Sequence, residues 1–106
     1  MGWGLDIVVR GDGELRVAGR LGRRTATQLR DALESALREG SGDLVVAAAD
    51  LEIWDAVGLG VLSGAARKAR RAVRRFVVTD ARAREQRLLR AARVPTTSRR
   101  TGRLAS

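Results

Sequence analysis

Residues 51–62 read LEIWDAVGLGVL, and this stretch decides the fold that we expect. It starts in a loop predicted over Asp50–Val57 and enters a helix at about Gly58. Beyond Gly58 the apolar residues recur every three or four positions, which predicts a helix with one buried stripe. That stripe consists of Leu59, Leu62, Ala65 or Ala66, Ala69 and Val73. Asp55 precedes the helix, where a carboxylate can accept hydrogen bonds from free backbone N–H groups.

Apolar segments flank this stretch on both sides. Leu44–Ala49 has no polar side chain, which predicts a short strand covered on both faces. Phe76–Thr79 predicts a further strand, and Arg82–Arg93 a third helix with Leu88, Leu89 and Ala92 as its apolar residues. Pro95 ends that helix, because the residue before a proline disfavours helical geometry.

Ahead of these elements, the chain predicts a β-hairpin and a first helix. Alternating residues of Leu5–Arg10 are apolar, the turn Gly11-Asp12-Gly13 follows, and Glu14–Gly19 forms the second strand. Thr25 with Gln28 three residues later has the spacing of a capping box. The helix stripe is Leu29, Ala32, Leu33, Ala36 and Leu37, and Gly40 ends the helix.

The predicted order is β-β-α-β-α-β-α, an α/β fold. We expect a single domain over residues 1–94, with a mixed β-sheet of about four strands and helices packed against it. Residues 95–106 are polar and basic and have no hydrophobic period, so we expect a disordered tail. The loop before the second helix lies on a common edge of strand ends, where functional sites often lie.

The same stretch carries a resemblance to a known family. Asp55 is followed by Gly58-Leu59-Gly60-Val61-Leu62, and Gly19-Arg20-Leu21 closes the second predicted strand. This pattern resembles the signature of STAS domains of the anti-sigma factor antagonist (anti-anti-sigma factor) type, which shows Asp-Ser-Ser/Thr-Gly-Leu-Gly-Val-Leu. The resemblance covers residues 5–94 and implies a STAS-like fold.

The resemblance also implies a function. Antagonists of this type bind an anti-sigma factor that is also a serine kinase, and phosphorylation of the serine after the aspartate ends the binding. By this resemblance the partner-binding residues are Trp54, Asp55, Ala56, Val57, Gly58 and Leu59. The chemistry suits the place, because a helix N-terminus favours an anion such as phosphate.

The sequence departs from the family at its switch. The phosphoacceptor position is Ala56 and the next residue is Val57, so neither carries a hydroxyl. We therefore expect a module that is not phosphorylatable at the usual site and acts constitutively, as a decoy or as a scaffold. The Gly-Gly turn of the family is replaced by Val73-Arg74, and its final short strand has no clear counterpart.

Two residues of this segment keep alternative roles. Asp55 either contacts a partner or caps the helix, and it can do both. Trp54 is either an exposed anchor, since tryptophan is enriched in binding hot spots, or a filler of the core under the loop.

Composition argues against catalysis. The 106 residues include no histidine and no cysteine, which removes the usual general base, thiolate nucleophiles and the commonest metal ligands. No carboxylate pair has a catalytic motif around it. We expect no enzyme, no catalytic residue, no cofactor and no metal.

The net charge of +9 is segregated, with −3 over residues 1–66 and +12 over residues 67–106. Six basic residues crowd the far end of the second helix, namely Arg67, Lys68, Arg70, Arg71, Arg74 and Arg75, where cations suit the helix dipole. Phe76 is the only aromatic residue of this half, so we expect no specific nucleic-acid binding.

Three kinds of partner remain as hypotheses, and we give them in order of preference. The first is an anti-sigma factor/serine kinase as the protein partner. The second, also implied by the resemblance, is a STAS subunit associated with a transporter ATPase of the lipid-transport ABC type. A charge-driven nucleic-acid or membrane-surface binder is the third. The longest uncharged run is too short to span a bilayer and no signal peptide is expected, so we expect a cytoplasmic protein.

Overall fold

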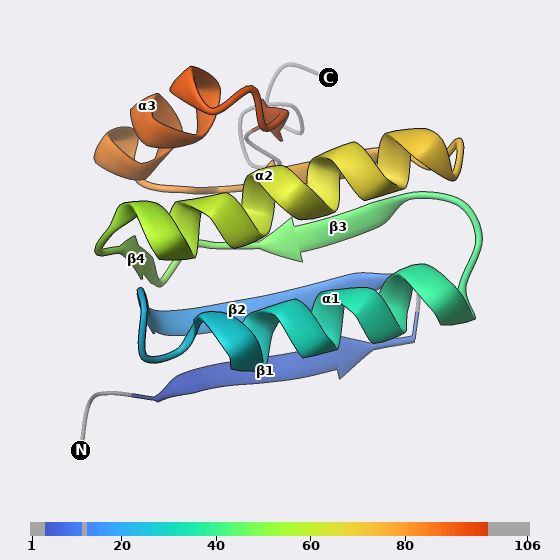
Figure 1. Cartoon of the computed structure of the whole chain (residues 1–106), viewed down its shortest axis with the longest axis horizontal. Helices are drawn as coiled ribbons and strands as arrows, with labels where there is room; N and C mark the ends of the chain where they lie inside the picture. The colour runs from blue at the N-terminus through green and yellow to red at the C-terminus, as the bar shows by residue number, and fades with distance from the viewer. Residues whose placement is uncertain (1–3, 12, 98–106) are drawn as a thin grey trace.

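The computed structural model describes residues 4–11 and 13–97. Within them lie six strands and three helices. In chain order these are β1 Leu5–Arg10, β2 Glu14–Leu21, α1 Ala26–Glu39, β3 Leu44–Ala47, β4 Leu51–Ile53, α2 Ala56–Arg71, β5 Phe76–Thr79, α3 Ala83–Ala91 and β6 Thr96–Thr97 (Figure 1).

The strands form one mixed sheet in the order β1-β2-β3-β5-β6. β1 is antiparallel to β2, whereas every other pairing is parallel. β4 also pairs with β2, beyond the end of β3, and opposes Leu51 to Gly19 and Ile53 to Leu21. The predicted α/β fold with a mixed sheet and packed helices is confirmed.

The helices lie on one face of this sheet (Figure 1). The crossovers from β2 to β3, from β4 to β5 and from β5 to β6 all advance in the same direction along the sheet. Since such crossovers are right-handed, they place all three helices on the same side. The prediction that Leu44–Ala49 is covered on both faces is therefore wrong. Leu44, Val46 and Ala48 are buried, but Val45 and Ala47 are only half-buried.

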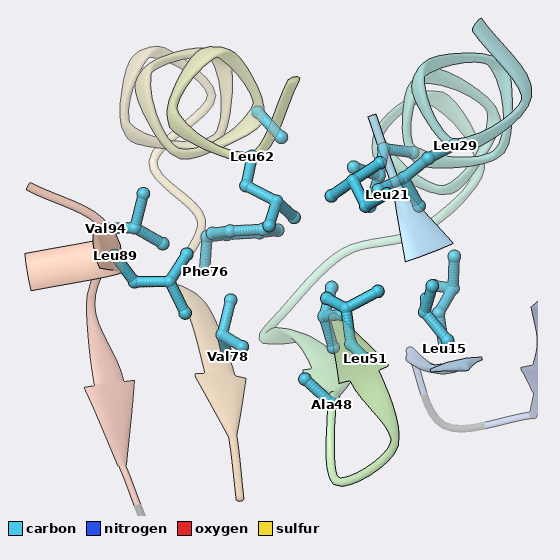
Figure 2. Close-up of a cluster of buried hydrophobic side chains, with 14 of the residues drawn as sticks. Leu15, Leu21, Leu29, Ala48, Leu51, Leu62, Phe76, Val78, Leu89 and Val94 are labelled. Atoms are coloured by element: carbon cyan, nitrogen blue, oxygen red, sulfur yellow. The ribbon is translucent and has the colours of Figure 1, made fainter. Parts of the chain in front are cut away.

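The hydrophobic core lies between the helices and the covered face of the sheet. Figure 2 shows Leu62 and Leu29 projecting from α2 and α1 toward Phe76, Val78 and Leu51 on the strands. Leu29 and Leu62 have no exposed surface, as the stripes of the predicted helices required, and Leu51 of β4 is equally buried.

Two short strands lie outside the predicted ones. β4 falls inside the predicted loop Asp50–Val57, and it forms because Leu51 and Ile53 bury their side chains while their backbone pairs with β2. β6 consists of Thr96 and Thr97, which lie in the predicted tail. They pair with β5, so the prediction of disorder is wrong for these two residues, and so is the expectation that a final short strand has no clear counterpart. The remainder of the predicted tail, residues 98–106, lies outside the described residues.

Helix ends also differ from the predicted ones. α2 begins at Ala56, two positions before the expected Gly58, and ends at Arg71, which leaves Val73 93% exposed with φ 57°. Thr25 precedes α1, but its side chain makes no capping bond. Its hydroxyl instead donates to the Arg20 carbonyl at 2.7 Å and accepts from the Gly22 N–H at 3.0 Å, which folds the β2–α1 loop back on itself.

Part of the basic cluster has partners within the fold. The Arg74 guanidinium donates to the carbonyls of Ala36, Leu37 and Gly42 at 2.9–3.1 Å, so it satisfies the C-terminal end of α1. Lys68 pairs with Glu34 of α1 at 2.8 Å and lowers the pKa of that half-buried carboxyl. These two contacts join α1 to α2 and its following turn.

Candidate functional site at the start of α2

Asp55 joins two loops that are far apart in sequence. Its Oδ1 accepts from the Gly58 N–H and its Oδ2 accepts from the Arg23 N–H, both at 2.9 Å. The N–H of Gly58, and then that of Arg23, lower the pKa of Asp55, because these bonds favour the charged carboxylate. The predicted cap is therefore present, and the same side chain also holds the β2–α1 loop against α2.

Two glycines permit this close approach. A Cβ on Gly58 would lie 2.7 Å from the Leu21 carbonyl oxygen, and one on Gly22 would lie 2.8 Å from Asp55 Oδ2. Gly58 is buried, so it shapes the predicted partner-binding segment from beneath and is not accessible as a surface contact. The first turn of α2 lies directly on the end of β2 for this reason.

Trp54 lies at the surface, so the alternative in which it fills the core under the loop is wrong. Its side chain is 50% exposed, and the Arg20 guanidinium lies 4.7 Å from the ring centroid. The indole N–H donates to Glu52 at 3.4 Å, and the backbone N–H donates to the Leu21 carbonyl at 2.8 Å. Trp54 is therefore an exposed aromatic residue on an anchored backbone.

Glu85 and Arg84 of α3 hold the same segment from the other side, and the sequence did not indicate them. Glu85 is 3% exposed and accepts from the Ile53 N–H at 3.3 Å, while Arg84 donates to the Ile53 carbonyl at 2.9 Å. Arg84 and Glu85 also pair at 2.8 Å. One signal was present: Glu85 is one of only two carboxylates in residues 67–106.

The exposed part of the predicted segment is apolar apart from Asp55. Trp54, Ala56 and Val57 are exposed, and Leu59 is half-buried. A hollow of about 220 Å³ is lined by Trp54, by Leu59 and by Arg84 and Leu88 of α3. Another of about 230 Å³ is lined by Trp54 together with Arg20, Arg23 and Arg24. The indole therefore borders both hollows, and the second is the more basic.

Ala56 is the first residue of α2 and is exposed. A hydroxyl at this position would face solvent, beside the Asp55 carboxylate. The alanine methyl offers no group to which a phosphate can be attached.

The family model described as "Mlab, STAS domain" matches residues 8–97, nearly the whole described part of the chain. The chain belongs to the STAS domain family. The match spans the hairpin, the candidate site and β6, so it includes the short final strand.

Solved structures agree on this STAS fold. The unphosphorylated anti-sigma factor antagonist SpoIIAA matches at a TM-score of 0.69 and 14% identity, covering 88% of this chain and 86% of that one. The phosphorylated SpoIIAA of Bacillus matches at 0.69 and 13%, covering 89% of each chain. A serine-to-glutamate variant of RsbS from Moorella thermoacetica matches at 0.64 and 23%, covering 88% and 84%. A search of the curated proteins by sequence finds no match.

Within residues 4–11 and 13–97, no helix is long and apolar enough to cross a membrane.

Proposed function

We propose that this chain is a protein-binding regulatory module of the anti-sigma factor antagonist type. It would bind an anti-sigma factor/serine kinase through the surface formed by Trp54, Asp55, Ala56, Val57 and Leu59. The observation that carries this proposal is the exposed Trp54 on a backbone that is anchored at Leu21 and Ile53. Aromatic anchors on ordered backbones bind with little loss of conformational entropy.

The site is ordered before any partner arrives. Asp55 ties the start of α2 to Arg23, and Glu85 and Arg84 tie Ile53 to α3. These contacts come from the β2–α1 loop and from α3, so the segment 53–58 is held from two sides. A surface of this kind supports binding rather than catalysis, and we propose no reaction for it.

The proposed module lacks the usual switch. With alanine at position 56, a partner kinase has no hydroxyl to phosphorylate there, so binding would persist in the presence of ATP. The protein would then act as a constitutive antagonist, a decoy or a scaffold.

The test mixes the purified chain with candidate anti-sigma kinases and ATP. We expect a complex without phosphate transfer to the wild type, and phosphate transfer to an Ala56→Ser variant. Ala83→Ser is the matched control, since Ala83 is the exposed first residue of another helix, α3. Stoichiometric phosphorylation of the wild type, or no kinase captured by any form, would contradict the proposal.

A transporter-associated STAS subunit is the second candidate. The missing hydroxyl favours it, because the transporter-associated domains that this chain resembles need no phosphoserine after the aspartate. Co-purification separates the two candidates: an ABC ATPase in the complex supports the second, and an anti-sigma kinase supports the first.

A further inference from the structure

β1 is an edge of the sheet. In the described part of the chain β2 is the only strand that pairs with it, so its other side is open (Figure 1). Val8 and Val9 of this strand are 51% and 71% exposed. An open edge carries backbone N–H and C=O groups that another strand can pair with.

The side chains of β1 have a symmetric charge pattern. Asp6, Val8 and Arg10 alternate with Leu5 and Ile7, which face the helices, so these three lie on the uncovered face of the sheet. Asp6 and Arg10 are exposed, and no ion pair joins either of them to another described residue. A negative and a positive charge thus stand equally far from Val8 in opposite directions.

We propose that β1 pairs antiparallel with β1 of a second copy of this chain, about a two-fold axis at Val8. Asp6 of each copy then lies opposite Arg10 of the other, and the two Val8 side chains face each other. On the covered face, Ile7 lies opposite Val9 of the second copy. Directly opposite side chains in an antiparallel pair are close enough to interact, and opposite charges stabilise the pair.

The charges select this register over its neighbours. Residues directly opposite one another point to the same face, so a two-fold pairing that keeps the helices on one side must be centred on a residue. A centre at Ile7 places Asp6 against Val8, and a centre at Val9 places Arg10 against Val8. The centre at Val8 opposes unlike charges and pairs residues 6–10 of a strand that spans Leu5–Arg10.

The neighbouring strand continues the same alternation. Within one copy Arg10 lies opposite Glu14, and Val8 lies opposite Arg16. In the proposed dimer one row of the open face therefore runs Glu14, Arg10 and then Asp6 of the second copy, with alternating sign. The Arg16 side chains of the two copies are kept apart by the pair of Val8 residues.

This arrangement would also give two candidate sites per particle. β1 begins at Leu5 opposite Gly19, near the end of the sheet where Leu21 contacts α2. Because the two β1 strands run in opposite directions, the two Trp54 surfaces lie at opposite ends of the joined sheet and are both accessible. A dimer could bind two partner molecules, or one dimeric partner with increased avidity.

The test measures molar mass over a dilution series by light scattering and sedimentation equilibrium. We expect wild type to approach twice the mass of one chain. Asp6→Arg alone and Arg10→Asp alone each oppose like charges at both pairs, and should raise the dimer dissociation constant roughly tenfold. Asp31→Arg makes the same charge change at an exposed position of α1 and should associate like wild type.

Mixing the two single variants is the decisive measurement. The Asp6→Arg chain presents two positive charges and the Arg10→Asp chain two negative ones, so an equimolar mixture should recover association as a heterodimer. Recovery also excludes misfolding of either variant as the cause of the loss. Wild type that stays at the mass of one chain at every concentration would overturn the proposal, as would single variants that dimerise normally or a mixture that does not recover.

Discussion

The carboxylate of Asp55 accepts a hydrogen bond from the backbone N–H of Arg23, 32 residues earlier in the chain. The same carboxylate caps α2 through Gly58. One side chain therefore links the β2–α1 loop to the helix that carries the candidate site, and the link makes the role of Asp55 testable apart from any partner.

Replacing Asp55 with alanine should destabilise the domain in the absence of a partner. The variant loses both a cap and a contact between loops, so we expect the melting temperature to fall by roughly 5 °C. Asp50→Ala is the control, because Asp50 is an exposed residue of the turn before β4, and within the described part of the chain its backbone carbonyl, not its carboxylate, accepts the hydrogen bond that it makes, from the Gly19 N–H. Equal melting temperatures for the two variants would argue against the link.

The hydrogen bonds that Asp55 accepts also predict that the stability of the fold depends on pH. The pKa of Asp55 is lowered from its ordinary value of 3.8 in the folded state, so its carboxylate binds protons less readily there than in the unfolded chain. Its contribution to stability is present above that ordinary value and is lost as the pH falls through the lower folded pKa. The difference in urea midpoint between wild type and Asp55→Asn should accordingly be largest near neutral pH and shrink below pH 3.8. A difference that stays constant with pH would show that charge plays no part.

Replacing Gly58 or Gly60 with alanine should change the free energy of unfolding in opposite directions. A Cβ at Gly58 meets the Leu21 carbonyl at 2.7 Å, so Gly58→Ala should cost about 1–3 kcal/mol through overpacking. A Cβ at Gly60 meets no atom within 4 Å and lies in the interior of a helix, so Gly60→Ala should stabilise by about 0.5–1 kcal/mol. Chemical denaturation of the pair measures both, and equal effects would contradict the close contact with β2.

Much of this fold follows from local patterns. The apolar runs that became β3 and β5, and the helical stripes through Leu29 and Leu62, are local signals, because burial of one face needs only a repeating side-chain pattern. β4 does not follow from a local pattern: its three residues become a strand because their partners on β2, Gly19 to Leu21, lie 32 positions earlier in the chain. At Thr25 a local pattern misleads. The spacing of Thr25 and Gln28 predicts a capping box, but in the folded loop the Thr25 hydroxyl donates to the Arg20 carbonyl instead.

The candidate site was predicted only in part for the same reason. Its segment could be located from the pattern around Asp55, whereas the exposure of Trp54 depends on how β4 joins β2. Glu85 looks like a solvent-facing residue of a charged helix, and only the fold buries it against Ile53.

Glu85 should therefore matter more than its sequence context suggests. Glu85→Ala removes the acceptor for the Ile53 N–H and leaves Arg84 without its ion pair, so we expect a loss of about 1–3 kcal/mol in unfolding free energy. Glu85→Gln keeps an acceptor of similar size and should lose less. Glu52→Ala is the control, because within residues 4–11 and 13–97 the Glu52 carboxylate takes part only in surface ion pairs at 3.8 Å and in one hydrogen bond of 3.4 Å. A Glu85→Ala variant as stable as Glu52→Ala would contradict the role of Glu85 in holding Ile53.

Trp54 should affect binding and leave stability nearly unchanged. Its indole is half exposed and contacts the surface groups Arg20 and Glu52, so Trp54→Ala should change the unfolding free energy by about 0.5 kcal/mol or less. If Trp54 anchors the partner, the same variant should weaken binding of the captured kinase or ATPase at least roughly tenfold, the scale of a hot-spot residue. Val73→Ala truncates an apolar side chain that is 93% exposed at the far end of α2, and it should bind like wild type. Titration calorimetry on the three proteins measures these affinities. Equal affinities for Trp54→Ala and wild type would show that the partner does not bind at the start of α2.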